Sequence, residues 1–148
     1  YVKGGDSPYH GDYSMGATLW LNEDQSIIFN SAGTRFNTDT LAYAGTIDDL
    51  VNATSFSQSK VANEIIATVK TYDPADYYGY TLYLQSSYRR FVGSYYSRVD
   101  DVALPLVDGK QSYAVKVFHS SMGRHVVLVQ VGSNVPEAAA STFHVIYR

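Results

Sequence analysis

The sequence predicts an all-β domain, and three observations support this fold class. First, three short patterns recur in the same order: TLWL at 18–21 with TLYL at 81–84, IDDL at 47–50 with VDDV at 99–102, and VKTY at 69–72 with VKVF at 115–118. Second, the apolar stretches are rich in β-branched and aromatic residues, which favour strands. Third, the 148 residues include 14 tyrosines, whose rings pack on sheets while their hydroxyls stay in water. A repeated strand, acidic turn and second strand indicates two copies of one supersecondary unit.

In the first part of the chain, the expected elements follow from local composition. Residues 1–16 are rich in Gly, Asp, Ser and Tyr and predict an irregular arm. Residues 17–21 and 26–29 predict a hairpin around a polar turn at 22–24. Residues 30–45 are polar, and we expect them to form a loop.

The following segment, residues 61–72, fits either a helix or a strand by its spacing. Its β-branched residues favour a strand, and a helix over residues 57–68 is the alternative. The sequence Asp-Pro-Ala-Asp at 73–76 predicts a turn. We expect this turn to separate two related halves, at about 17–72 and 80–118.

The second half has clearer signals. Asp108-Gly109 predicts a turn that tolerates positive φ, and residues 120–124, with Gly123, predict a hairpin connection. Residues 132–141 predict a loop, in which 137–140 could form one helical turn. We expect a C-terminal hairpin over residues 119–148. Strands are expected at residues 80–84, 90–93, 112–118, 125–131 and 142–147.

Composition indicates a single compact domain over residues 1–148. The net charge of −3 argues against a nucleic-acid partner, and the longest apolar runs are too short to span a membrane. The absence of cysteine excludes disulfides and thiolate metal sites. The chain starts at Tyr1 without Met or a signal-like stretch, as expected for a processed form or a fragment. The glycosylation sequon at residues 52–54 fits a secreted protein, which is our expectation for localisation.

The repeat resembles the βγ-crystallins in three elements taken in order. These are a first strand with an aromatic residue, an acidic turn followed by an apolar residue, and a Val-Lys strand preceded by a polar stretch, here residues 63–70. The resemblance implies a Greek-key β-sandwich built from two related halves, with the C-terminal hairpin as an addition. The family's hairpin glycine is replaced by Ile27 and Arg90 in this chain. The implied function is that of a secreted, non-enzymatic binding or structural module, or an antimicrobial, toxin-like protein.

The resemblance also implies a calcium site, because many microbial members bind calcium where the two units cross. Calcium prefers six to eight hard oxygen ligands. Ala67 replaces one ligating hydroxyl, and the second copy supplies ligands only if its register slips by one residue. We therefore expect weak calcium binding. The implied ligands are Asn63, Glu64, Thr68, Asp108 and Ser112.

A different function, a small hydrolase of ribonuclease or glycosidase type, would use His and carboxylate side chains. His119 and His125 flank the loop at 120–124 and could approach each other across the hairpin, with His144 on the last strand. Three imidazoles would suit zinc. His125, Arg124 and Glu64 could form a set for RNA cleavage. The acidic pairs at 48–49 and 100–101 could provide acid and base only between copies, since neighbours in a strand point to opposite faces. Solvated turn residues are the simpler interpretation.

An aromatic region at 72–96 gives a third hypothesis, a carbohydrate-binding module or protein-binding surface. Tyrosine beside arginine forms platforms for sugar rings or protein partners. The alternative is that these tyrosines line the core and cover the strands. We expect Arg90 at a strand edge, with its guanidinium near the ring of a neighbouring tyrosine. The candidate ligand-binding residues are Tyr83, Tyr88, Arg89, Arg90, Tyr95 and Tyr96.

Overall fold

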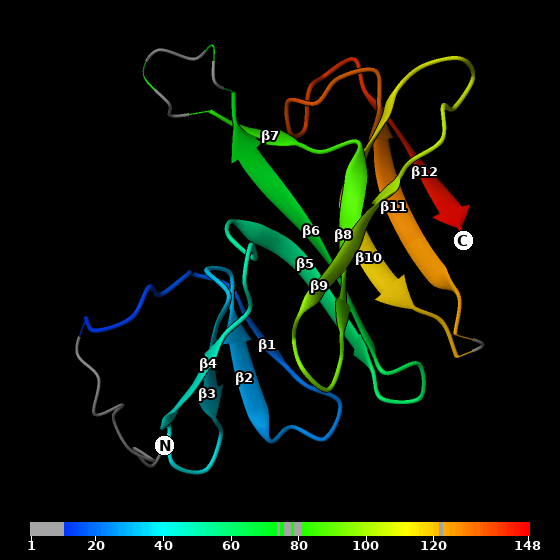
Figure 1. The fold of residues 1–148 in the computed structure, drawn as a ribbon. Coiled ribbons are helices and arrows are strands. Elements are labelled where there is room, and N and C mark those ends of the chain that lie inside the picture. The colour runs from blue at the N-terminus through cyan, green and yellow to red at the C-terminus, as the bar shows by residue number, and fades with distance from the viewer. Residues whose placement is uncertain (1–10, 74, 76–77, 79–80, 122) are drawn as a thin grey trace, which may run out of the picture.

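The computed structural model describes residues 11–73, 75, 78, 81–121 and 123–148, and it is all-β across these residues (Figure 1). The predicted fold class, an all-β chain of sandwich character, is confirmed. The strands are β1 (Leu19–Leu21), β2 (Ile27–Asn30), β3 (Thr34–Asn37), β4 (Tyr43–Thr46), β5 (Ala53–Ser59), β6 (Glu64–Tyr72), β7 (Leu82–Leu84), β8 (Ser87–Val92), β9 (Arg98–Ala103), β10 (Ser112–His119), β11 (His125–Val131) and β12 (Thr142–Tyr147).

The strands form three antiparallel sheets. The first sheet is the meander β1-β2-β3-β4, and the third sheet is the meander β10-β11-β12. The central sheet has the order β5-β6-β8-β9, with β7 paired to the end of β6. Figure 1 shows the central sheet, in green, between the first sheet (blue to cyan) and the third sheet (yellow to red).

Two hydrophobic cores join the three sheets. The first core lies between the first and central sheets, where Phe29, Phe56 and Phe91 meet Ile65. The second core lies between the central and third sheets and includes Ile66, Tyr88, Val117, Val127 and Val129. Ile65 and Ile66 are neighbours on β6 and enter different cores, because successive side chains of a strand point to opposite faces. β6 is therefore buried on both faces, which explains why its apolar run fitted two kinds of element.

Hydroxyl groups of the central sheet form hydrogen bonds with backbone groups of β10 along the edge that does not pair with β11. Ser55 Oγ accepts a hydrogen bond from the Val117 N–H at 3.1 Å and donates one to the Val117 carbonyl at 3.2 Å. Ser57 Oγ accepts from the His119 N–H at 3.1 Å, and Thr68 Oγ1 donates to the Val115 carbonyl at 3.4 Å. The third sheet is thus joined to the central sheet by hydrogen bonds as well as by apolar packing.

The prediction of a loop over residues 30–45 is wrong, because this segment contains β3 and β4. Gly33, with φ of 83°, makes the tight turn from β2 to β3. Thr34 and Phe36 are then buried while Arg35 and Asn37 are half-buried, the alternation of a strand with one covered face. The alternative helix over residues 57–68 is also wrong, because β5, a turn and the start of β6 occupy it.

The repeated acidic patterns do not occupy equivalent positions. Asp48 and Asp49 lie in the turn between β4 and β5, whereas Asp100 and Asp101 lie within β9. The Val-Lys segments also differ, since β6 lies inside the central sheet and β10 lies at the edge of the third sheet. Because β6 pairs with β8, the boundary expected at 73–76 falls within one sheet; Pro74 and Asp76 lie outside the described residues. Greek-key connectivity stays a prediction.

The predictions for the C-terminal part agree with the structure. β11 and β12 have the predicted bounds and pair as an antiparallel hairpin. Asp108 and Gly109 adopt φ values of 50° and 74° in the predicted turn. The loop predicted over residues 132–141 is present, and residues 137–140 form turns in place of the alternative helical turn, with Ser141 N donating to the Ala138 carbonyl. Among the residues described, no helix is long and apolar enough to cross a membrane.

Candidate functional site

A cluster of two histidines and a glutamate lies where the third sheet meets the central sheet. His119 ends β10, His125 begins β11, and the two residues face each other in the antiparallel register. Glu64 begins β6, and its Oε2 lies 2.6 Å from His125 Nε2 and 3.3 Å from His119 Nε2. These side chains are only 6%, 12% and 18% exposed for His119, His125 and Glu64. Three groups that can bind a proton or a metal ion therefore converge at a largely buried position.

Hydroxyl groups hold the other nitrogen of each imidazole. His119 Nδ1 lies 3.0 Å from Ser57 Oγ, and His125 Nδ1 lies 2.6 Å from Tyr88 Oη. The two rings are nearly perpendicular, at 87°, with centroids 5.3 Å apart. With both Nδ1 atoms bound to hydroxyls, both Nε2 atoms point at the same carboxylate oxygen. The orientation of each ring is thereby fixed from both sides.

Arginine and a second carboxylate complete the electrostatics. Arg90 places one terminal nitrogen 3.3 Å from Glu64 Oε1 and binds both oxygens of Asp100, each at 2.6 Å. These hydrogen bonds raise the pKa of Arg90 and lower the pKa of Asp100. The two carboxylates and the one guanidinium sum to one negative charge, without counting the histidines. The net charge of Glu64, Asp100 and Arg90 is therefore negative.

The pKa values of two further groups reflect burial. Burial lowers the pKa of His119 from 6.5, opposed by its hydrogen bond to Glu64, and nearby His125 lowers it further. Burial is also the largest cause that raises the pKa of the Tyr88 hydroxyl. Burial therefore favours the neutral imidazole of His119, and it favours the protonated hydroxyl of Tyr88.

A cavity of about 620 Å³ borders the cluster on the side of His119. Its wall is formed by the β5–β6 turn and by the β10–β11 connection, with Glu23 contributed by the β1–β2 turn. This cavity gives the otherwise buried cluster a route to solvent. Its other lining residues are Gln58, Ser59, Val61, Ala62, Ser120, Ser121 and Gly123.

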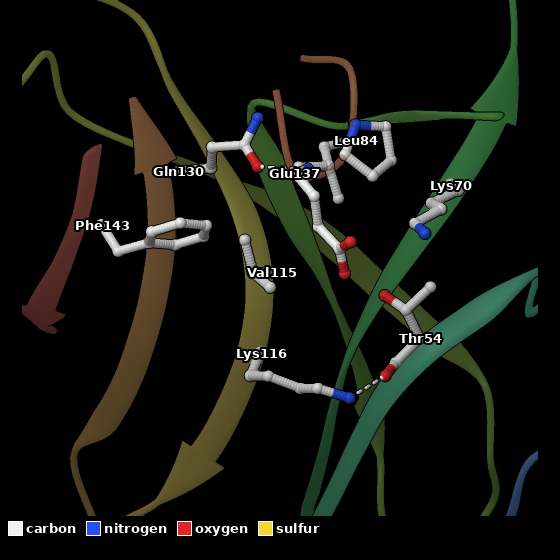
Figure 2. A pocket seen from close by; sticks show the side chains of 9 residues that line it. Thr54, Lys70, Leu84, Val115, Lys116, Gln130, Glu137 and Phe143 are labelled. Atoms are coloured by element: carbon white, nitrogen blue, oxygen red, sulfur yellow. Dashed lines mark hydrogen bonds between the residues drawn. The ribbon is translucent and has the colours of Figure 1, made fainter. Parts of the chain in front are cut away.

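A second cavity, of about 250 Å³, lies at another part of the junction between the central and third sheets (Figure 2). Figure 2 shows the Glu137 side chain directed into it, with Lys70 and Thr54 from the central sheet and Phe143 from β12 around it. Lys116 Nζ donates to the Thr54 carbonyl at 2.7 Å. This lysine adds a further link between the two sheets.

The third sheet also carries an exposed apolar face. On β12, Phe143, Val145 and Tyr147 are 53%, 52% and 67% exposed, while Ile146 points to the second core. Phe118 on β10 is 52% exposed, and the register places it in one row with Val126 and Tyr147. We call this surface the outer face. It is formed by Phe118, Val126, Leu128, Phe143, Val145 and Tyr147.

The predicted tyrosine–arginine surface does not form one platform. Tyr88 is buried in the second core, Tyr96 packs against the first core, and Tyr95 is exposed. Tyr83 is half-buried on β7. Tyr77 and Tyr80 of the aromatic region lie outside the described residues.

The two arginines of that surface pair with carboxylates. Arg89 lies 3.9 Å from Asp101, on the face of β8 opposite to Arg90. The expected edge position of Arg90 is wrong, because β8 lies between β6 and β9. Within the described part of the chain, Arg35 lies over a tyrosine ring, 3.7 Å from the centroid of Tyr96.

The five implied calcium ligands lie in different settings. Glu64 belongs to the histidine cluster, and Asn63 lies in the preceding turn with φ of 49°. Thr68 is buried and binds Thr54 and the Val115 carbonyl. Asp108 lies in its turn, and Ser112 donates to the Pro105 carbonyl at 2.6 Å. The hydroxyls of Thr68 and Ser112 thus have backbone partners.

The predicted approach of His119 and His125 across the hairpin agrees with the structure. His144 lies on β12 beside Thr142, apart from the cluster, and the arginine next to Glu64 is Arg90 in place of Arg124. Sequence reasoning did not assign Ser57 or Tyr88 to this site. Their roles depend on how the third sheet docks on the central sheet.

Comparisons with known proteins show a similarity of fold to a solved structure. No family model matches the chain, and no curated protein matches it. Among solved structures, the chain is similar to Kuenenia stuttgartiensis hydrazine synthase, with a TM-score of 0.54 and 12% sequence identity. The match covers 90% of this chain and 36% of the hydrazine synthase chain, so this chain spans about a third of the length of that protein. At this identity the likeness shows the fold alone.

Proposed function

We propose that this chain is a non-enzymatic structural and binding module that extends its stack of sheets by taking up a further β-sheet on the outer face. The observation that carries this proposal is the exposure of Phe118, Phe143, Val145 and Tyr147 on one face of the third sheet. Taking roughly 200 Å² for an aromatic residue and less for valine, these four side chains present on the order of 400 Å². An apolar surface of about this size equals the largest patch on a typical monomer, and such a patch is often functional.

The pattern of β11 supports a sheet as the occupant. Its residues HVVLVQV form a nearly continuous apolar run, as do those of β6, and β6 is buried on both faces. Strands covered on both faces have such runs, whereas strands with one wet face alternate. The inward face of β11, with Val127 and Val129, already packs on the central sheet. An apolar layer on the outer face would continue the same mode of packing.

We propose a second copy of this chain as the occupant, because the chain carries a second exposed apolar surface. At the other end of the stack, Leu19 and Leu21 on β1 are 57% and 52% exposed, while Trp20 between them packs against the first core. A molecule with apolar surfaces at both ends can associate head to tail with its copies. The outer face is smaller than the roughly 800 Å² per partner of a standard interface, so we expect association in the micromolar range.

The positions of the tyrosines support a scaffold more than a sugar platform. A carbohydrate-binding module would need a row of exposed rings, whereas Tyr88 is buried and Tyr96 packs against the first core. These rings contribute to the cores that hold the three sheets together. The binding function of this chain is therefore proposed for the outer face.

Sedimentation velocity over a range of concentrations tests this proposal. The native chain should associate, and Val145→Glu on the outer face should remain a monomer at all concentrations. Val61→Glu is the matched control, because Val61 is 97% exposed in the β5–β6 turn and does not belong to the outer face. Leu21→Glu should also abolish association if the copies bind head to tail. A native chain that stays monomeric at about 1 mM would refute the proposal.

A further inference from the structure

The Glu64–His119–His125 cluster has a donor set that is suited to zinc and similar divalent ions. One oxygen and two imidazole nitrogens from these residues all lie within 4.8 Å of one another. In a tetrahedral zinc site, bonds of about 2.0–2.2 Å place ligand atoms roughly 3.3–3.6 Å apart. The distance from Glu64 Oε2 to His119 Nε2 is already 3.3 Å, and the contact to His125 Nε2, at 2.6 Å, needs a small outward shift.

The surroundings of both histidines match those of metal ligands. Ligating histidines almost always have a second partner on the ring nitrogen that does not bind the metal, which fixes the ring orientation. Ser57 and Tyr88 occupy this position for His119 and His125, respectively. The Ser57 and Tyr88 hydroxyls come from the central sheet, while both histidines belong to the third sheet. The arrangement of ligand atoms is thus prepared before any ion binds.

The charge and the access of the site also favour a cation. Glu64 and Asp100 carry two negative charges against the single positive charge of Arg90, which binds the Glu64 oxygen that faces away from the histidines. The cavity beside His119 offers space for water as a fourth ligand. Two imidazoles and one carboxylate with an open fourth position form a donor set that zinc uses in proteins.

We infer that Glu64, His119 and His125 form a tridentate site for zinc or a similar divalent transition-metal ion. Glu64 belongs to the central sheet and both histidines to the third sheet, so the bound ion links two layers of the fold. This inference is independent of association through the outer face, because the cluster lies at the junction between sheets. The ion takes the place of the two hydrogen bonds that join Glu64 to His119 and His125.

Metal titration of the full chain, after treatment with a chelator, tests this inference. Calorimetry with zinc should show one ion per chain, and cobalt, which takes the same ligands, should give the visible absorption of a four-coordinate complex. Glu64→Gln and His125→Ala should each weaken zinc binding by at least about 100-fold. Tyr88→Phe retains all three ligands and should weaken binding by about 10-fold, through loss of the hydroxyl that orients His125. His144→Ala is the matched control and should bind zinc as the native chain does.

Thermal unfolding with and without zinc provides a second measurement, which also shows whether each variant is folded. Zinc should raise the unfolding temperature of the native chain and of His144→Ala, and it should leave that of folded Glu64→Gln unchanged. The inference would be overturned if the native chain bound no zinc at about 1 mM. It would also be overturned if binding survived the loss of Glu64 and His125 and was lost in His144→Ala. Neither result would affect association through Val145.

Discussion

Replacing Ser55 by alanine should destabilise the chain far more than the loss of one hydroxyl suggests. Ser55 is 4% exposed, and its hydroxyl forms hydrogen bonds with both the N–H and the carbonyl of Val117, which is fully buried. Alanine would leave both backbone groups without this partner. Each buried polar group that loses its hydrogen bond costs about 1–3 kcal/mol, so we expect a loss of about 2–4 kcal/mol after local relaxation.

Urea denaturation measures this loss directly, with Ser97→Ala as the control because Ser97 is exposed. A domain of this size has a total stability of about 5–15 kcal/mol, so the change should be a large fraction of the whole. It corresponds to a fall of roughly 5–15 °C in the unfolding temperature. Hydrogen exchange should locate the effect, because the Val117 amide should exchange faster in Ser55→Ala. Equal stabilities for the two variants, with an unchanged Val117 amide, would show that the hydroxyl bridge does not hold β10.

Three further predictions concern the cores, a turn and acid stability. Phe29→Ala should cost about 3–5 kcal/mol in the free energy of unfolding, because Phe29 is fully buried against Phe56 in the first core; a loss below about 1 kcal/mol would contradict this packing. Gly33→Ala should destabilise more than Gly109→Ala in thermal melts, since both have positive φ but only at Gly33 would a Cβ lie 2.6 Å from a carbonyl, that of Leu50. The Asp100 carboxyl has a lowered pKa in the folded state, so it stabilises the fold above its ordinary pKa of 3.8, and this contribution is lost as pH falls through the folded value. Asp100→Asn should therefore lose less stability than the native chain between pH 7 and pH 3, and equal losses would contradict the pairing with Arg90.

The strands with local signals could be predicted from the sequence. β11 and β12 are apolar, β-branched runs bounded by turn residues, and their predicted bounds agree with the structure. β9 was missed because its sequence RVDDVA is charged and its side chains are largely exposed. The sequence predicts a turn at Asp100 and Asp101, but these residues face Arg90 and Arg89 across the β8–β9 pair. Only the strand partner reveals that these charges are compatible with a sheet.

The candidate site could be predicted only in part. Short connections bring their two ends together, so the sequence indicated that His119 and His125 approach each other. The sequence offers Glu64 as a calcium ligand and as a partner of His125 for RNA cleavage, but its contact with both histidines depends on how the third sheet crosses the central sheet. Tyr88 was placed on a recognition surface, whereas its ring fills the second core and its hydroxyl reaches His125. Such long-range contacts leave no local pattern in a single sequence.

The strand order of the central sheet has a consequence for folding during synthesis. The first sheet is a local meander, so its backbone hydrogen bonds can form soon after β4 has been made. Its apolar side, with Phe29, is covered by residues as late as Phe91 on β8 and Tyr96 after it. A ribosome that pauses between these segments would therefore present a formed but uncovered sheet. Such a nascent chain would be a preferred substrate for chaperones that bind exposed apolar surface.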